Sequence, residues 1–119
     1  MLNISIKNNY IIDITNDLKP KIACRDMLVF NLNSEKSTLA FKLKNFDDVK
    51  NILLKVITPD KDYMIIEPKF IIGTEREKVF QIVLDNELKS TIGKYPYQVV
   101  INNQVVMTSM YQVIDEELI

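Results

Sequence analysis

The sequence predicts an all-β fold, an antiparallel immunoglobulin-like β-sandwich of about eight strands with one short helical turn. Apolar residues alternate with polar residues in short runs, and turn-forming residues recur at intervals of roughly ten residues. These strand patterns do not alternate with long helical patterns. A chain of 119 residues is long enough to bury one hydrophobic core. We therefore expect a single immunoglobulin-like domain over residues 1–119.

The first third of the chain predicts extended structure. Residues 1–19 hold short apolar alternations and are expected to form an N-terminal arm or an edge strand. Pro20 restricts the residue before it to extended geometry, so a strand is expected to start within 21–25. The apolar run 27–32 is predicted as a strand, with a short helix as the alternative, because it contains β-branched and aromatic residues.

The middle of the chain contains a one-face-buried strand and a hairpin. In residues 38–44 the apolar side chains share one face and the polar side chains share the other. The run 52–58 is predicted as a strand, because its β-branched residues disfavour the alternative, a helix over 49–56. Pro59 and the aspartates after it suit a tight turn, so residues 63–66 are expected to return beside the strand.

A strand over 79–84 is predicted to lead into the helical turn. The pair Asp85–Asn86 supplies its cap, because either side chain accepts hydrogen bonds from free backbone N–H groups. Leu88 and Ile92, four residues apart, would share one face and close the end of the core. Gly93 is expected to end the turn in the left-handed conformation that glycine adopts easily.

The last two runs, 95–101 and 105–114, predict a closing hairpin with two alternative registers. A three-residue loop over 102–104 is preferred because it gathers apolar and aromatic side chains on one face. This register pairs Ile101 with Val105, Val99 with Met107, Tyr97 with Ser109 and Tyr95 with Tyr111, and Val113 continues the same face. A two-residue loop over 102–103 is the alternative, and it buries more polar side chains. It pairs Ile101 with Gln104 and Tyr97 with Thr108.

The other face of this hairpin is a mixture of polar and apolar side chains. Its apolar members need cover, so we expect them to contact a partner. Tyrosines outside the core face can serve the same purpose, or can serve as platforms for a sugar. The candidate interface residues are Val100, Val106, Met110, Ile114, Tyr10 and Tyr63. Residues 115–119 have an acidic start and are expected to begin a linker helix.

Composition argues against several kinds of site. The chain has no histidine, the side chain most used for proton transfer and metal binding. Its single cysteine, Cys24, excludes an internal disulfide or a cysteine zinc site and is expected to be a core residue. A formal charge of −1 disfavours a nucleic-acid partner. No apolar run is long enough for membrane insertion.

Carboxylate pairs are the remaining candidates for catalytic or metal-binding residues. All of them lie in predicted turns or at the chain end. Turns favour aspartate for local hydrogen bonds, so these pairs are interpreted as turn residues rather than catalytic acids. A calcium site at Asp60 and Asp62 would lack the glycine and glutamate of a calcium loop. The pairs are Asp47/Asp48, Asp60/Asp62, Glu75/Glu77 and Glu116/Glu117. We expect no catalytic residue, no cofactor and no metal.

From Lys42 onwards the order of these patterns resembles the N-terminal domain of the baseplate upper protein family of phages that infect Gram-positive bacteria. That family shows a strand entering a proline-aspartate turn, an aromatic-apolar strand, a helical turn, a Gly-x-Tyr strand start and a final Ser/Thr-aromatic strand. The matching segments are residues 55–61, 80–84, 85–92, 93–95 and 108–113. They cover about the last two thirds of the chain.

The resemblance implies an immunoglobulin-like domain at the N-terminus of a tail or baseplate protein in the virion. Such a domain is a structural attachment module without catalysis, and it docks a receptor-binding or fibre component onto the distal tail. Its expected partners are other tail and baseplate proteins, and a homo-oligomer in the full-length assembly is a further expectation. The protein would be made in the host cytoplasm. The alternative function is a carbohydrate-binding or adhesin-type β-sandwich module.

Overall fold

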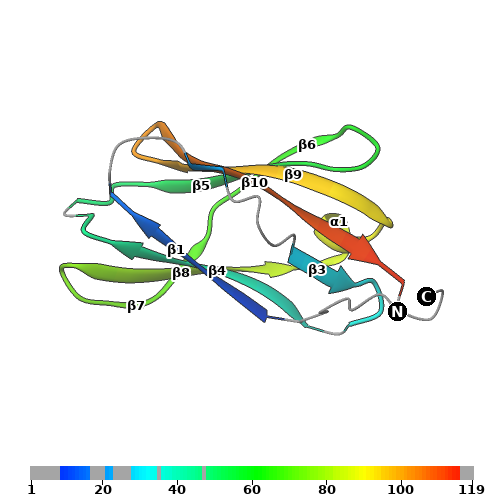
Figure 1. Cartoon of the computed structure of the whole chain (residues 1–119), viewed down its shortest axis with the longest axis horizontal. Coiled ribbons are helices and arrows are strands. Elements are labelled where there is room, and N and C mark those ends of the chain that lie inside the picture. The colour runs from blue at the N-terminus through cyan, green and yellow to red at the C-terminus, as the bar shows by residue number, and fades with distance from the viewer. Residues whose placement is uncertain (1–8, 17–20, 23–27, 35, 47, 116–119) are drawn as a thin grey trace.

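The computed structural model describes residues 9–16, 21–22, 28–34, 36–46 and 48–115. Within these ranges the chain forms ten strands and one short helix, and the strands make two sheets packed as a sandwich (Figure 1). The strands are β1 Asn9–Thr15, β2 Lys21–Ile22, β3 Leu28–Asn31, β4 Ser37–Lys44, β5 Ile52–Ile57, β6 Tyr63–Ile66, β7 Lys69–Gly73, β8 Glu77–Leu84, β9 Gly93–Ile101 and β10 Gln104–Ile114. The helix is α1 Asn86–Lys89. The all-β sandwich prediction is confirmed.

The two sheets are mixed, so the prediction of a wholly antiparallel sandwich is wrong. One sheet has the order β1-β4-β8-β7, and β1 runs parallel to β4. The other has the order β2-β10-β9-β5-β6, with β3 also paired to β10, and both β2 and β3 run parallel to β10. A parallel pair needs a long crossover connection, and the chain between β1 and β4 supplies one by adding β2 and β3 to the opposite sheet.

The inner faces of the two sheets bury an aromatic cluster. Tyr95 and Tyr111 stack with ring centroids 4.7 Å apart, and Phe30 meets Tyr111 edge to face at 5.6 Å. Phe41 of the β1-β4-β8-β7 sheet packs edge to face with Tyr97 of the other sheet at 6.3 Å. The tyrosines predicted for the core face are therefore buried, as expected. Cys24, the arm residues 1–8 and 17–19, and residues 116–119 of the expected linker helix lie outside the described residues.

The closing hairpin combines the two registers that the sequence allowed. Its turn has two residues, Asn102 and Asn103, with φ of 49° and 67°, and Ile101 pairs with Gln104. A bulge between Val105 and Met107 then shifts the register. Beyond it, Val99 pairs with Met107, Tyr97 with Ser109 and Tyr95 with Tyr111. The three-residue loop and its pair Ile101–Val105 are therefore wrong, whereas the three core-facing pairs beyond the bulge are confirmed.

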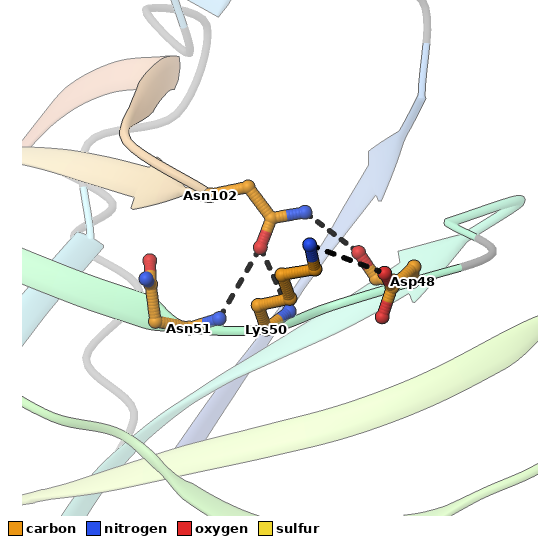
Figure 2. A network of polar contacts seen from close by, with 4 residues as sticks. All are labelled: Asp48, Lys50, Asn51 and Asn102. Atoms are coloured by element: carbon orange, nitrogen blue, oxygen red, sulfur yellow. Dashed lines mark hydrogen bonds and ion pairs between the residues drawn. The ribbon is translucent and has the colours of Figure 1, made fainter.

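Asn102 ties this hairpin to the segment before β5 (Figure 2). Its Oδ1 accepts hydrogen bonds from the backbone N of Lys50 at 2.7 Å and of Asn51 at 3.2 Å. Its Nδ2 donates to the carbonyl oxygen of Asp48 at 2.6 Å, and Lys50 Nζ lies 4.0 Å from Asp48 Oδ2. An asparagine suits this position because it tolerates positive φ and carries both a donor and an acceptor.

The β5–β6 hairpin and its turn agree with the prediction. Ile57 pairs with Tyr63, and the helix alternative for this region is wrong. The Thr58 hydroxyl accepts from Asp62 N at 3.1 Å, and Lys61 N donates to Thr58 O at 2.8 Å. Lys61 adopts a φ of 68°, so the turn closes through a left-handed residue that is not glycine.

Helix α1 closes one end of the sandwich. Asp85 caps it by accepting hydrogen bonds from Glu87 N and Leu88 N, as predicted. Leu88 is buried, but Ile92 is exposed because the helix ends at Lys89. The expected shared face is therefore wrong. Gly93 does not end the helix either: it starts β9 with a φ of 149°, and a Cβ there would meet Pro59 at 2.9 Å.

Candidate functional site

Exposed apolar side chains lie on β6 and β7, the two strands that the chain joins where it crosses between the sheets. This crossing runs through Glu67 and Pro68, which join β6, the outer strand of one sheet, to β7, the outer strand of the other (Figure 1). Ile57, Tyr63 and Ile65 are all exposed on the outer face here. Ile57 pairs with Tyr63, and Ile65 lies two residues further along the same face of β6. We call these three residues the β5–β6 patch.

Strand β7 itself is exposed at every residue, from Lys69 to Gly73. Phe70, Ile71 and Ile72 are 52%, 49% and 66% exposed. The strand pairs only with β8 in the described sheet, where Phe70 meets Phe80 edge to face at 5.5 Å. A bulge between Phe70 and Ile72 leaves Ile71 without a paired residue on β8. We call Lys69–Gly73 the β7 edge.

A polar pocket of about 360 Å³ lies between the β5–β6 turn and the segment that follows α1. Acidic and hydroxyl side chains dominate its lining, and Tyr63 connects it to the β5–β6 patch. The Thr58 hydroxyl donates to the Asp60 carboxylate and thereby lowers the pKa of that carboxyl group. The lining residues are Thr58, Asp60, Asp62, Tyr63, Met64, Glu87, Ser90, Thr91 and Tyr95.

Buried tyrosines hold the wall of this pocket in place. The Tyr95 hydroxyl donates to Thr91 O at 2.6 Å and accepts from Thr91 N at 3.1 Å. The Tyr111 hydroxyl donates to Leu88 O at 2.6 Å. Burial raises the pKa of both tyrosines, so the hydroxyls remain protonated donors. The pocket wall is therefore anchored to the core.

Lys89 is a buried charged residue that links the helix to the rest of the fold. It donates to Ser37 Oγ at 3.0 Å and to the carbonyl oxygen of Ser34, and burial lowers its pKa. Its ammonium group therefore fastens α1 to the loop before β4. Across the described ranges, no three acidic, cysteine or histidine side chains gather as a metal site would require. Nor does any helix in these ranges have the length and hydropathy to cross a membrane.

The six side chains predicted as a partner interface do not form one surface. Tyr63 is 58% exposed, whereas Val100 is 6% exposed and Val106 packs against the core. Met110 and Ile114 are half-buried on β10. Tyr10 lies on β1, in the opposite sheet. Its hydroxyl reaches β3, donating to Val29 O at 2.9 Å and accepting from Val29 N at 3.0 Å. A partner role for these residues remains a prediction.

The sequence reasoning missed the β7 edge. The run Lys69–Ile72 was recognisable as extended, because Pro68 precedes it and a charged loop follows Gly73. Three consecutive apolar residues are typical of a strand buried on both faces. Composition therefore predicts a buried strand, whereas β7 is exposed. Only the strand order of the sheet places this run at its edge.

The fold is similar to that of a known phage protein domain. No protein-family model matches the chain, and a search of the curated proteins finds no match. Among solved structures, the chain is similar to the N-terminal domain of phage TP901-1 ORF48, with a TM-score of 0.56 and 8% sequence identity. The match covers 88% of this chain and 97% of that chain. At this identity the similarity shows a common fold.

A second similar structure is much larger. It is the Pseudomonas fluorescens alkylpurine DNA glycosylase AlkC bound to DNA containing an abasic site analog, with a TM-score of 0.47 and 14% sequence identity. The match covers 72% of this chain and 27% of that chain. A partial similarity of this size carries no argument about function.

Proposed function

We propose that this chain is a structural attachment module of a phage tail or baseplate protein, and that it docks a receptor-binding or fibre component onto the distal tail without catalysis. The observation that carries the proposal is the fold similarity to a phage protein's N-terminal domain, which extends over 97% of that domain. The order of sequence patterns from Lys42 onwards supports the same assignment independently. The module would act in the virion.

The β5–β6 patch is the docking surface that we favour. Ile57, Tyr63 and Ile65 are neighbours on one face, and they are exposed although each is apolar or aromatic. Burying such side chains against a partner removes apolar area from water, and aromatic residues contribute strongly to interfaces. Opposite Ile65 stands Lys55, which supplies a charged rim. The patch thus combines an apolar centre with a polar border.

The test is to mix the chain with the other tail proteins encoded by the same genome. Size-exclusion chromatography with light scattering should show a shift of this chain into a complex. The double variant Tyr63→Ala/Ile65→Asp should lose that shift, because it removes the aromatic ring and adds a charge to the patch. Both side chains are exposed, so the variant should unfold at the same denaturant concentration as the wild type.

Val83 provides the matched control, since it is 58% exposed, as Tyr63 is, but lies on β8 of the opposite sheet. The variant Val83→Asp should keep the complex. Equal loss of the complex in both variants would exclude the β5–β6 patch as the specific docking surface. Absence of any complex with the tail proteins would overturn the attachment function itself.

A carbohydrate-binding module is the second candidate, and the polar pocket favours it. Exposed tyrosine rings stack on sugars, and carboxylate and hydroxyl groups bond sugar hydroxyls; Tyr63, Asp62 and Ser90 supply these groups around one pocket. A glycan array separates the two functions. Saturable glycan binding that is lost in Asp62→Ala, without complex formation with tail proteins, would support this candidate over docking.

A further inference from the structure

The β7 edge presents a hydrogen-bonding edge with nothing beyond it in the described sheet. The order β1-β4-β8-β7 places β7 last, so its backbone groups on the side away from β8 have no strand to pair with there. Unpaired N–H and C=O groups of an edge strand are a template for another strand. Natural edge strands usually prevent such pairing with charged side chains, prolines or bulges.

On β7 these features are confined to the start of the strand and to one bulge. Lys69 is its only charged residue, and Pro68 lies before the strand. The bulge changes the pairing with β8, and it leaves Ile71 without a partner on that side. The centre of the strand, Phe70–Ile72, therefore shows three consecutive exposed apolar side chains on both faces. An extended apolar segment is the kind of partner that fits such an edge.

A second copy of β7 satisfies this requirement. In an antiparallel pair related by a two-fold axis at Ile71, Phe70 of each copy lies opposite Ile72 of the other, and the two Ile71 residues face each other. Directly opposed side chains in such a pair have Cβ atoms about 5 Å apart, which allows close apolar contact. The apolar segment is thus complementary to itself in this orientation.

Charge favours the same orientation. Lys69 of each copy would lie opposite Gly73 of the other, and the exposed Glu75 lies just beyond Gly73, in the turn between β7 and β8. The two opposite charges would therefore meet at this end of the pair, where exposed charges at short range attract each other. Glu67 lies before Pro68, in the segment that crosses between the sheets, so it is not part of the paired strand. An antiparallel pair therefore places Lys69 of one copy near the acidic turn of the other at each end, whereas a parallel pair would place Lys69 beside Lys69.

We propose that two copies of this chain associate through β7 in an antiparallel, two-fold pair centred on Ile71, which joins their β1-β4-β8-β7 sheets into one continuous sheet. The proposal rests on the strand order, exposure and charge of the β7 edge and is independent of the phage-tail assignment. It also leaves the β5–β6 patch free for a different partner.

Cysteine cross-linking tests the pair directly. In the full chain, Ile71→Cys should form a disulfide-linked dimer under mild oxidation, because the two positions face each other at the two-fold axis. Mass spectrometry assigns the link to position 71 rather than to the native Cys24. Ile11→Cys is the matched control: Ile11 is 70% exposed on β1, the opposite edge of the same sheet. Cross-linking of Ile71→Cys at the slow rate of this control would overturn the proposal.

A charge exchange tests the orientation. Lys69→Glu and Glu75→Lys should each weaken dimerisation by about tenfold in light scattering, because each variant places like charges at both ends of the pair. The double variant, which restores opposite charges, should recover wild-type dimerisation. Ile71→Lys should give a monomer with unchanged unfolding, because this side chain is half exposed. A wild-type chain that stays monomeric at high concentration, or a double variant weaker than both single variants, would contradict the pairing.

Discussion

Strands β1 and β7 are the two edges of the same four-stranded sheet, yet they differ in how the rest of the molecule covers them. β1 turns Tyr10, Ile12 and Ile14 into the core and leaves mainly polar residues outside. β7 is exposed on both faces and is apolar at its centre. The side chains of an edge strand, as well as its free backbone groups, therefore decide whether the edge is protected.

The two edge strands also differ in their polar contacts with the rest of the sheet. On β1, Asn9 Oδ1 accepts from Thr38 Oγ1 at 2.5 Å, and Asp13 Oδ2 lies 3.3 Å from Lys44 Nζ. Asn16, which follows the strand, donates its backbone N–H to Lys44 O at 3.1 Å. On β7 the aromatic contact with the neighbouring strand is apolar, Phe70 against Phe80. β1 is thus fastened to its own sheet, whereas β7 is available to another strand.

The largest predicted effect separates a core-facing side chain of β1 from an exposed side chain of β7. Ile14→Ala removes a fully buried side chain from the core, so we expect a loss of about 2–5 kcal/mol in the free energy of unfolding. Ile72→Ala removes a 66% exposed side chain, and the expected change is within about 0.5 kcal/mol. Urea unfolding of the wild type and both variants measures these values. Equal losses would show that β7 is packed against something in the free chain.

Alkaline pH is expected to lower the free energy of unfolding by an intermediate amount, because tyrosines buried in the core ionise. Burial raises the pKa of Tyr97 to about 12, above its ordinary value in the unfolded chain. The neutral phenol is therefore favoured by folding, and this stabilisation is complete below about pH 10 and is lost as the pH rises towards about 12. Burial raises the pKa of Tyr111 in the same sense, whereas it lowers that of Lys89, which acts in the opposite direction.

We therefore expect Tyr97→Phe to flatten the decline in unfolding free energy between about pH 10 and pH 12. Ile65→Ala, an exposed and non-titrating position on β6, should leave the wild-type decline unchanged. Denaturant unfolding across this pH range measures both slopes. An unchanged slope in Tyr97→Phe would show that the hydroxyl of Tyr97 is solvated in the folded chain.

The smallest predicted effect concerns the ion pair that links β1 to β4. Asp13→Asn should lower the free energy of unfolding by about 0.2–1 kcal/mol, because an exposed ion pair with Lys44 contributes little. The loss should shrink as salt is added, since salt screens exposed charges. Lys69→Gln on β7 is the control and should leave the stability of the monomer unchanged. A salt-independent loss in Asp13→Asn would indicate that hydrogen bonding, rather than charge, fastens this edge.

Local patterns predicted the covered parts of the fold well. Period-two alternation placed Tyr95, Tyr97 and Tyr111 on the core face, and Asp85 was recognisable as a helix cap. The closing hairpin shows where two local preferences compete. Asn102 and Asn103 favour a two-residue turn through positive φ, whereas the apolar face further along favours the other register. A bulge satisfies both, and neither preference alone predicts it.

The edge of the sandwich could not be predicted in this way, because its position depends on pairing between distant segments. Whether β1 meets β4 in parallel, and whether β7 has a second neighbour, follows from how the chain crosses between the sheets. Because pairing between distant segments cannot be predicted from local patterns, the exposure of the candidate interface residues could not be predicted reliably either. Val100 was assigned to an outer face by alternation and is nevertheless buried, whereas Tyr63 was recognised as a candidate and is exposed.

Amide hydrogen exchange can show whether β7 pairs with a second strand, because it reports on the backbone groups of β7 themselves. Exchange is measured for residues 69–73 at low and at high protein concentration, with the amides of β1 as the internal reference. We predict that the β7 amides slow markedly at high concentration while those of β1 keep their rates, since only β7 gains a neighbouring strand. Exchange in β7 that stays independent of protein concentration would show that β7 does not pair with a second copy.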